Sequence, residues 1–208
     1  MLSALATYSF GPAELTFKGG LMIPSDNLGQ VYNQDEVTIN EEIRTFDDLE
    51  ARTGYSLGIK VAASLADWLK VYGHIGIHNT GTAEYAIYSD LSKNDEIGTL
   101  RANQFIVPVG GGLELHFLEV SQFDFYLTPQ LNFNYITNDV ELIGNAVGAL
   151  ESNPQNARLG YGIGGGTDID LGVVIVNTEL LYQNINTVFR GEDELGKGLV
   201  SLTVGLTF

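Results

Sequence analysis

Apolar and polar residues alternate along this chain over stretches much longer than an ordinary strand. From Phe105 to Phe117 the odd-numbered positions are aromatic, aliphatic or glycine, and the even-numbered ones are mostly glycine or polar, with Ile106 as the large apolar exception. The same alternation runs from Phe123 to Tyr135. Strands of soluble proteins are usually about 5–6 residues long. About twelve steps of ~3.3 Å at a tilt of ~45° span ~28 Å, close to the ~25 Å apolar band of a barrel that crosses a membrane.

Alternation of this kind recurs eight times, and the stretches between the repeats are long and short in turn. Bacterial membrane barrels have this asymmetry, with short periplasmic turns and longer extracellular loops. We therefore predict an all-β protein with one domain over residues 1–208, an eight-stranded antiparallel up-and-down transmembrane β-barrel with long extracellular loops and short periplasmic turns. The predicted strands cover residues 13–24, 54–65, 69–81, 103–117, 122–137, 157–171, 173–186 and 198–208. The predicted loops cover residues 25–53, 82–102, 138–156 and 187–197, and the turns lie near 66–68, 118–121 and 171–172.

Glycine indicates which face of the strands points into the barrel. One face of the sixth predicted strand consists of Gly160, Gly162, Gly164 and Gly166. A crowded eight-stranded lumen needs small residues beside long ones. The face that carries glycine and charge is therefore predicted to point inward, and the aliphatic face is predicted to contact lipid. A soluble, lipocalin-like barrel would have the opposite arrangement.

The last predicted strand ends the chain on an aromatic residue. Its apolar positions alternate with serine, threonine and glycine, and they are Val200, Leu202, Val204, Leu206 and Phe208. This strand resembles the C-terminal assembly signal of outer-membrane β-barrels, at Val204, Leu206 and Phe208. With the loop order, the whole chain resembles the OmpA/OmpX-type family of outer-membrane β-barrel domains. The resemblance implies a Gram-negative outer-membrane location, both termini in the periplasm and insertion by the barrel-assembly machinery. It implies no reaction.

Composition narrows the class of protein further. The 208 residues carry a formal net charge of −16 with 44% hydrophobic residues, and cysteine is absent. The negative charge argues against nucleic acid as a partner. The chain lacks the run of about 18 apolar residues that a transmembrane helix requires. Residues 1–12 precede the first strand, and because Ala4-Leu5-Ala6 resembles a secretory cleavage site, residues 1–6 are interpreted as a signal-peptide remnant or simply the start of the chain.

The inward parity of the strands places charged residues in the lumen. Buried charge without partners is costly, so we expect a satisfied internal network, and a narrow ion path or a salt-bridge switch is the alternative. His74 and His78 lie about 13 Å apart along one strand, which is too far for one metal ion without a further ligand, so no metal is assigned. The predicted lumen network comprises Glu14, Lys18, Lys60, Lys70, His74, His78, Glu114, His116, Asp124, Arg158, Asp168 and Glu179.

The predicted loops hold most of the charge, with 18 acidic residues against six basic ones. We interpret them as an acidic, solvated cover. Residues 40–52 could form a short helix, because Asn40 can cap it and acidic residues suit its positive end. The segment from Asp90 to Glu96 offers oxygen ligands as calcium loops do, but it lacks the glycine and distal glutamate of an EF-hand. Asp90, Asn94 and Glu96 are therefore candidates for a loosely bound divalent cation such as Ca²⁺, and no other cofactor is expected.

The leading hypothesis is a non-enzymatic outer-membrane barrel, a structural or interaction protein that displays acidic extracellular loops, alone or as a subunit of a larger envelope complex. Its expected partners are outer-membrane lipid and lipopolysaccharide, the barrel-assembly machinery and another envelope or surface protein. The alternatives are a narrow channel or transporter for ions or small apolar molecules, and a barrel-embedded hydrolase. No catalytic residue is assigned, because histidine and serine occur without an oxyanion-hole motif or a recognisable triad.

Overall fold

The computed structural model describes residues 13–24, 36–39, 42–45, 52–88, 96–144, 150–152, 155–189 and 196–208. These residues form strands joined by turns, and no helix among them is long and apolar enough to span a membrane. The strands are β1 (Ala13–Pro24), β2 (Glu36–Ile39), β3 (Glu42–Thr45), β4 (Arg52–Ala66), β5 (Leu69–Gly81), β6 (Ala83–Tyr88), β7 (Glu96–Val120), β8 (Phe123–Gly144), β9 (Leu150–Ser152), β10 (Gln155–Asp170), β11 (Ile175–Val188) and β12 (Gly198–Thr207).

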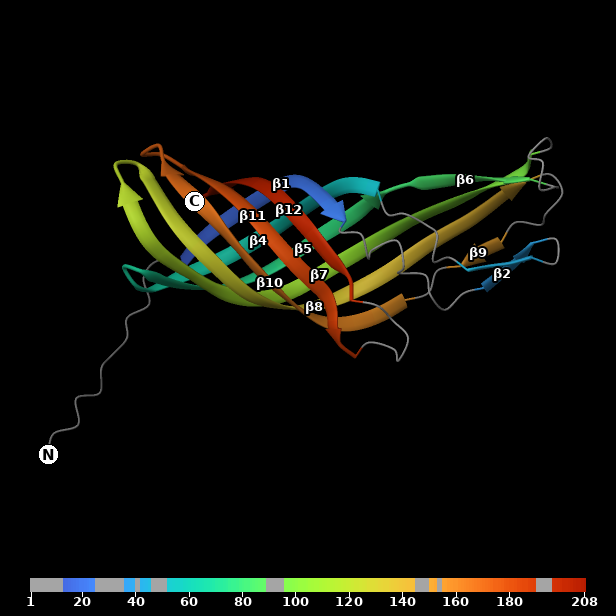
Figure 1. Ribbon diagram of the computed structural model, residues 1–208. Coiled ribbons are helices and arrows are strands. Elements are labelled where there is room, and N and C mark those ends of the chain that lie inside the picture. The colour runs from blue at the N-terminus through green and yellow to red at the C-terminus, as the bar shows by residue number, and fades with distance from the viewer. Residues whose placement is uncertain are drawn as a thin grey trace, which may run out of the picture.

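Eight of these strands close into a barrel. Each pairs antiparallel with both neighbours in the order β1, β4, β5, β7, β8, β10, β11 and β12, and β12 returns to pair with β1. Figure 1 shows the strands tilted around a common axis. The eight-stranded antiparallel up-and-down barrel predicted from the alternation is therefore confirmed. Closure leaves these strands without a free edge over the length of the barrel.

One end of the barrel carries the short connections and both ends of the strand sequence. Two residues join β4 to β5 and two join β7 to β8, where Ser121 has a φ of 58°. The turn between β10 and β11 needs Gly172, whose φ is 84° and whose amide donates to Asp170 Oδ1 at 2.7 Å. At the same end the amide of Leu15 donates to the carbonyl of Phe208 at 3.0 Å, which joins the start of β1 to the end of β12.

The opposite end differs from the sequence prediction, because parts of the expected loops are strand. Residues 82–102 contain β6 and the beginning of β7, and residues 138–156 contain the end of β8, β9 and the beginning of β10. Strands β6, β7, β8 and β9 pair side by side here and project beyond the closed barrel, as Figure 1 shows. The strands continue to pair here because backbone hydrogen bonds between strands satisfy the N–H and C=O groups outside the membrane as well as inside it. We call this four-stranded extension the projecting sheet.

Two local details complete this end of the molecule. Between β5 and β6 the pairing with β7 shifts by one residue, and Thr80 Oγ1 accepts the amide proton of Gln104 at 2.7 Å. The short helix expected over residues 40–52 is wrong at 42–45, which form β3 and pair with β2. Alternation of β-branched residues such as Ile43 and Thr45 favours a strand there over the helix that Asn40 would cap.

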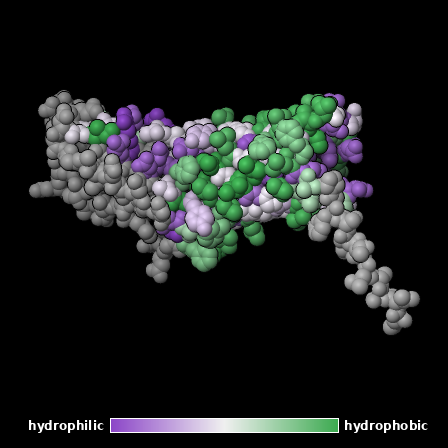
Figure 2. Space-filling view, turned by 180° about the vertical axis from the view of Figure 1, so that it is seen from behind, coloured by the Kyte–Doolittle hydropathy of each residue, from purple (hydrophilic) through white to green (hydrophobic). Residues whose placement is uncertain are grey.

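The outer surface of the barrel is apolar, and this is visible as the green band in Figure 2. Leu131 is 64% exposed and Ile163 59% exposed. A soluble protein rarely exposes so many large apolar side chains on one continuous surface. Tyr55 and Tyr135 lie toward the projecting end of this band. At the turn end the exposed aromatic side chains are Trp68, Phe117, Phe123 and Phe208. An apolar band with aromatic residues at both borders is the surface of a barrel that sits in a bilayer.

The glycine face points inward, as the alternation predicted, and the glycines make room for large side chains. A Cβ on Gly166 would lie 2.3 Å from the hydroxyl of Tyr126, and one on Gly112 would lie 2.6 Å from that of Tyr72. A Cβ on Gly162 would lie 2.8 Å from the side chain of Gln130. The inward glycines of β7 and β10 are therefore the space that long lumen residues of neighbouring strands occupy.

Candidate functional site

The lumen contains a buried ion pair between β4 and β7. Lys60 Nζ donates to Glu114 Oε1, and the side chains are 3% and 2% exposed. The ammonium group also lies 5.6 Å from the ring centroid of Tyr72 and 5.4 Å from that of Tyr126. Two aromatic faces and a carboxylate therefore surround this cation, which compensates for its removal from water.

Two further lysines pair with carboxylates on other strands. Lys18 Nζ donates to Glu179 Oε1 at 2.6 Å, joining β1 to β11. Lys70 Nζ donates to Glu14 Oε2 at 2.8 Å and lies 3.8 Å from Asp168 Oδ2, which connects β5 to β1 and β10. These pairs join residues up to 161 positions apart in the chain.

A histidine extends the same cluster toward the turn end of the barrel. His116 Nδ1 lies 2.7 Å from Asp124 Oδ2, and its Nε2 lies 3.8 Å from Glu114 Oε2. The His116 side chain is 5% exposed, whereas that of Asp124 is 36% exposed. The arrangement resembles the base and orienting acid of a catalytic triad, but among the contacts of His116 in the described structure no serine or threonine hydroxyl is placed to act as nucleophile.

Tyrosine and amide side chains link the ion pairs and fill the middle of the lumen. Tyr126 accepts a hydrogen bond from Asn177 Nδ2 at 2.8 Å and donates to Glu179 Oε2 at 3.4 Å, and Asn177 Nδ2 also donates to Asp168 at 2.7 Å. Tyr72 contacts the hydroxyl of Thr128 at 2.6 Å. Further along the barrel Asn132 Nδ2 donates to Gln183 at 2.7 Å, and Gln130 and Thr128 are 6% and 0% exposed. This middle layer leaves little room for solvent.

Two members of the predicted network, His78 and Arg158, lie nearer the projecting end, and a third, His74, is the cross-strand neighbour of Lys60. His78 Nε2 lies 3.3 Å from Gln183 Nε2, and the His74 ring lies 5.8 Å from that of Tyr72. Arg158 donates to the carbonyl of Ala157 at 3.1 Å and lies 3.5 Å from the side chain of Asn156. Within the described ranges, no three histidine or carboxylate side chains are arranged to hold a metal ion.

An apolar layer crosses the lumen on the projecting side of these polar layers. Ile106 and Ile136 face each other on β7 and β8. Met22 on β1 and Leu199 on β12 are both 0% exposed, and Ile185 on β11 is 1% exposed. Sequence reasoning recognised only Ile106 as an inward apolar residue. The other four residues also lie at inward positions of their strands. They form a layer because they lie at a similar height in the barrel, and this height follows from the register between strands and cannot be read from any one strand.

The lumen is therefore filled along its central section. Side chains that lined a water-filled path would be accessible to solvent. Seven of the eight barrel strands instead carry inward side chains that are exposed by 6% or less, among them Thr16, Lys60, Tyr72, Glu114, Gln130, Glu179 and Ser201. The five side chains of the apolar layer are at most 3% exposed, so solvent does not reach them. The interior can hold strands together, but it is not an open pore.

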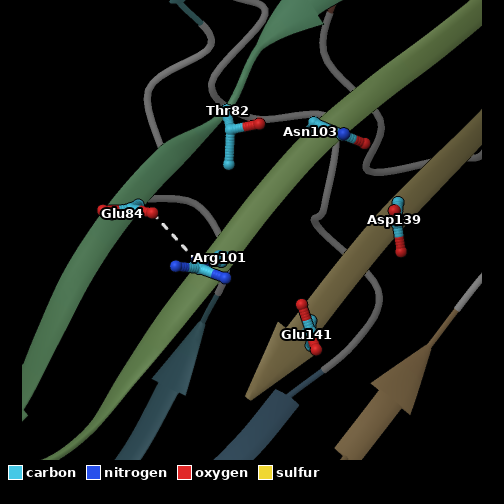
Figure 3. Close-up of a pocket in the computed structure, with 6 residues that line it drawn as sticks. All are labelled: Thr82, Glu84, Arg101, Asn103, Asp139 and Glu141. Carbon is cyan, nitrogen blue, oxygen red and sulfur yellow. Dashed lines mark hydrogen bonds and ion pairs between the residues drawn. The ribbon is translucent and has the colours of Figure 1, made fainter. Parts of the chain in front are cut away.

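A small cavity lies outside the lumen, on the outward face of the projecting sheet. Its volume is about 310 Å³, and Figure 3 shows the side chains that line it. Arg101 on β7 faces Glu84 on β6 and Glu141 on β8 across the strands, and its Nε donates to Glu84 Oε1 at 2.9 Å. The lining residues are Thr82, Glu84, Arg101, Asn103, Asp139 and Glu141. Three carboxylates against one guanidinium give this surface a net negative charge. The sequence prediction placed all of these positions except Asn103 in loops.

The remaining predicted positions are placed as follows. Val204, Leu206 and Phe208 point outward from the last strand and are 55%, 46% and 68% exposed. Asp90 and Asn94 of the proposed cation loop lie outside the described residues, and Glu96 is the first residue of β7. The N-terminal segment 1–12 also lies outside them.

Comparison with known proteins gives a match in structure only. No protein-family model and no curated protein sequence matches the chain. The solved structure of Neisserial surface protein A (NspA) superposes with a TM-score of 0.55 at 14% sequence identity, over 96% of this chain and 97% of that one. This chain has the fold of the small eight-stranded outer-membrane β-barrels. The attachment invasion locus protein Ail of Yersinia pestis is also similar, with a TM-score of 0.48 at 11% identity over 94% and 99% of the two chains.

OprG from Pseudomonas aeruginosa matches with a TM-score of 0.45 at 13% identity, over 97% of this chain and 98% of that one. The match to NspA covers 96% of this chain, so a small barrel accounts for nearly all of it. The predicted resemblance to OmpA/OmpX-type barrels is confirmed at the level of the fold, and an apolar outer band around a polar interior is the arrangement of a barrel that lies in a membrane. Fold alone does not give its function.

Proposed function

We propose that this barrel is a non-enzymatic outer-membrane protein that acts through the surface it displays outside the cell, as a structural or interaction protein. The observation that carries the proposal is the filled lumen combined with the projecting sheet. A plugged interior, with Glu114 and Glu179 paired to lysines, leaves the transmembrane part as a rigid anchor. The part that extends beyond the apolar band is then the part able to meet a partner.

The proposed orientation places the short turns and both ends of the strand sequence in the periplasm. It is supported by the asymmetry of the connections, since barrels of this class have short periplasmic turns. The projecting sheet and the acidic segments around it would then face the exterior. Lipopolysaccharide, through loosely bound divalent cations, and another envelope or surface protein are the partners that such a surface suits. Val204, Leu206 and Phe208 would serve recognition by the barrel-assembly machinery during insertion.

The described structure favours neither the channel nor the hydrolase. Ion transport would require a wetted path past Ile106 and Ile136, and both are at most 3% exposed. Hydrolysis would require a nucleophile beside His116, whose polar contacts are the carboxylates of Asp124 and Glu114. We therefore propose no catalytic residue and no cofactor.

The orientation is tested by labelling single cysteines in intact cells, because the natural chain has none. Ala86→Cys lies on exposed β6, and Gln122→Cys lies in the exposed turn between β7 and β8. We expect a membrane-impermeant maleimide to label Ala86→Cys in intact cells and to label Gln122→Cys only after the outer membrane is permeabilised. Labelling in the reverse order would place the projecting sheet in the periplasm and would contradict the proposed function.

A further inference from the structure

Among the strands that the structure describes, the projecting sheet ends in an unpaired edge at β6. Strand β6 continues the line of β5 and pairs with β7 on one side. On its other side the neighbour of β5 is β4, whose pairing ends at Arg52 opposite Gly81, just before β6 begins. Within the described residues β6 is therefore the last strand of its sheet, and Figure 1 shows it at the margin of the projection. An edge strand presents unpaired N–H and C=O groups to which another extended chain can add.

The charge beside this edge limits what can add to it. Glu84 projects from β6 on the outward face, and Asp139 and Glu141 follow on β8, with Arg101 between them on β7. Glu84 is 54% exposed and Arg101 46% exposed, so the row is open to a strand that lies alongside. A chain that added to β6 would place one outward side chain directly beside Glu84, because the row crosses the strands and continues away from the edge through Arg101 to Glu141. A basic side chain at that position would be attracted by the net negative surface, and an acidic one repelled.

A second copy of the protein fits this edge poorly. Each chain carries a formal net charge of −16, and pairing two β6 edges would bring two such acidic rows together. Like charges placed opposite each other on neighbouring strands are destabilising. A surface with three carboxylates and one guanidinium is complementary to a basic segment instead.

We propose that β6 is a docking edge for an extended basic segment of a partner protein, which adds to the sheet as a further strand with lysine or arginine side chains on its outward face, one of them beside Glu84 at the edge of the acidic row. The inference rests on the proposed function, because it names the chemistry of the partner for the displayed surface. The backbone ladder supplies affinity, and the row of charges supplies the preference for basic side chains. The cavity of about 310 Å³ at this row is large enough for one long basic side chain.

The test uses the full chain in phosphatidylcholine nanodiscs and a fluorescent peptide of ten residues that alternates lysine and threonine. Two relatives of this peptide are N-methylated, one on every lysine and the other on every threonine. Because alternate amides of a strand point to opposite edges, one methylated peptide should lose at least tenfold in affinity and the other should bind as the parent does. Amide hydrogen exchange in residues 83–88 should slow when the parent peptide binds.

Charge is tested with matched variants. Glu84→Gln combined with Glu141→Gln should weaken binding of the lysine peptide by roughly fivefold, since exposed charge pairs each contribute a modest amount. The control combines Glu119→Gln with Asp170→Asn, which removes two exposed charges at the opposite end of the barrel and should leave the affinity unchanged.

Equal binding of both methylated peptides, or absence of any binding, would overturn the inference. It would also be overturned by equal weakening in the two pairs of variants, or by a glutamate-threonine peptide that binds as tightly as the lysine peptide. These outcomes are distinct from failure of the proposed function. Reversed cysteine labelling would overturn that function, whereas correct labelling without peptide binding would remove only the docking edge.

Discussion

Replacing Glu114 with leucine is expected to destabilise the barrel by about 3–5 kcal/mol, because Lys60 then remains in the lumen as a buried charge without its carboxylate partner. Both side chains are at most 3% exposed, so water cannot replace the lost contact without opening the interior. Lys60→Met should have a comparable effect, since it leaves Glu114 unpaired. The free energy of unfolding is measured by reversible urea denaturation of the protein in lipid vesicles.

The double variant distinguishes loss of the pair from damage to the packing. Lys60→Met combined with Glu114→Leu removes both charges, and we expect most of the stability to return, because apolar side chains of similar volume often replace a buried ion pair without loss. Glu84→Gln provides the surface control, as it breaks the exposed pair with Arg101 and should cost less than about 1 kcal/mol. Two single variants within about 1 kcal/mol of the wild type would contradict the view that this pair is buried and shielded from water.

Leu131→Arg is expected to destabilise the folded barrel in lipid by about 2–4 kcal/mol, because it places a charge in the middle of the lipid-facing band. Leu131 is 64% exposed and points outward from β8. Ile143 lies on the same face of the same strand, twelve positions further on and within the projecting sheet, where it is 40% exposed. Ile143→Arg should therefore cost little, and the two variants are compared by the same unfolding measurement.

The contrast between these two positions tests where the membrane ends along β8. If Ile143→Arg were as costly as Leu131→Arg, the projecting sheet would have to lie inside the bilayer. If neither substitution changed the free energy of unfolding, the apolar face would not contact lipid, and the assignment of apolar side chains to the outside of the barrel would be wrong.

The sequence was sufficient for the barrel because alternation is a local signal. The residues from Phe123 to Tyr135 alternate without interruption, and one side of them is buried while the other is exposed in the structure. The same signal misplaced the end of this strand. The predicted strand ended at residue 137, because the polar residues Asn138 and Asp139 follow it, whereas β8 continues to Gly144. Polarity reports where lipid ends and not where backbone pairing ends.

The partners in the lumen could not be predicted in the same way. Parity gives the face of each residue, but the pairing of Lys18 with Glu179 depends on strand order and on the stagger of the register around the barrel. The apolar layer has the same origin, since Met22 and Leu199 lie at similar heights only because of that stagger. The cavity at Arg101 was missed because five of its six lining residues, all but Asn103, come from segments interpreted as loops.

The central claim is that the lumen is closed, and conductance in planar bilayers tests it most directly. The refolded protein is first shown to be a barrel by its heat-modifiable mobility in gels, and it is then compared with the Lys60→Met and Glu114→Leu double variant. The filled lumen predicts that neither protein gives discrete openings. Discrete openings in the wild-type protein, with a current that changes in the double variant, would contradict it and would place Lys60 and Glu114 on a conducting path.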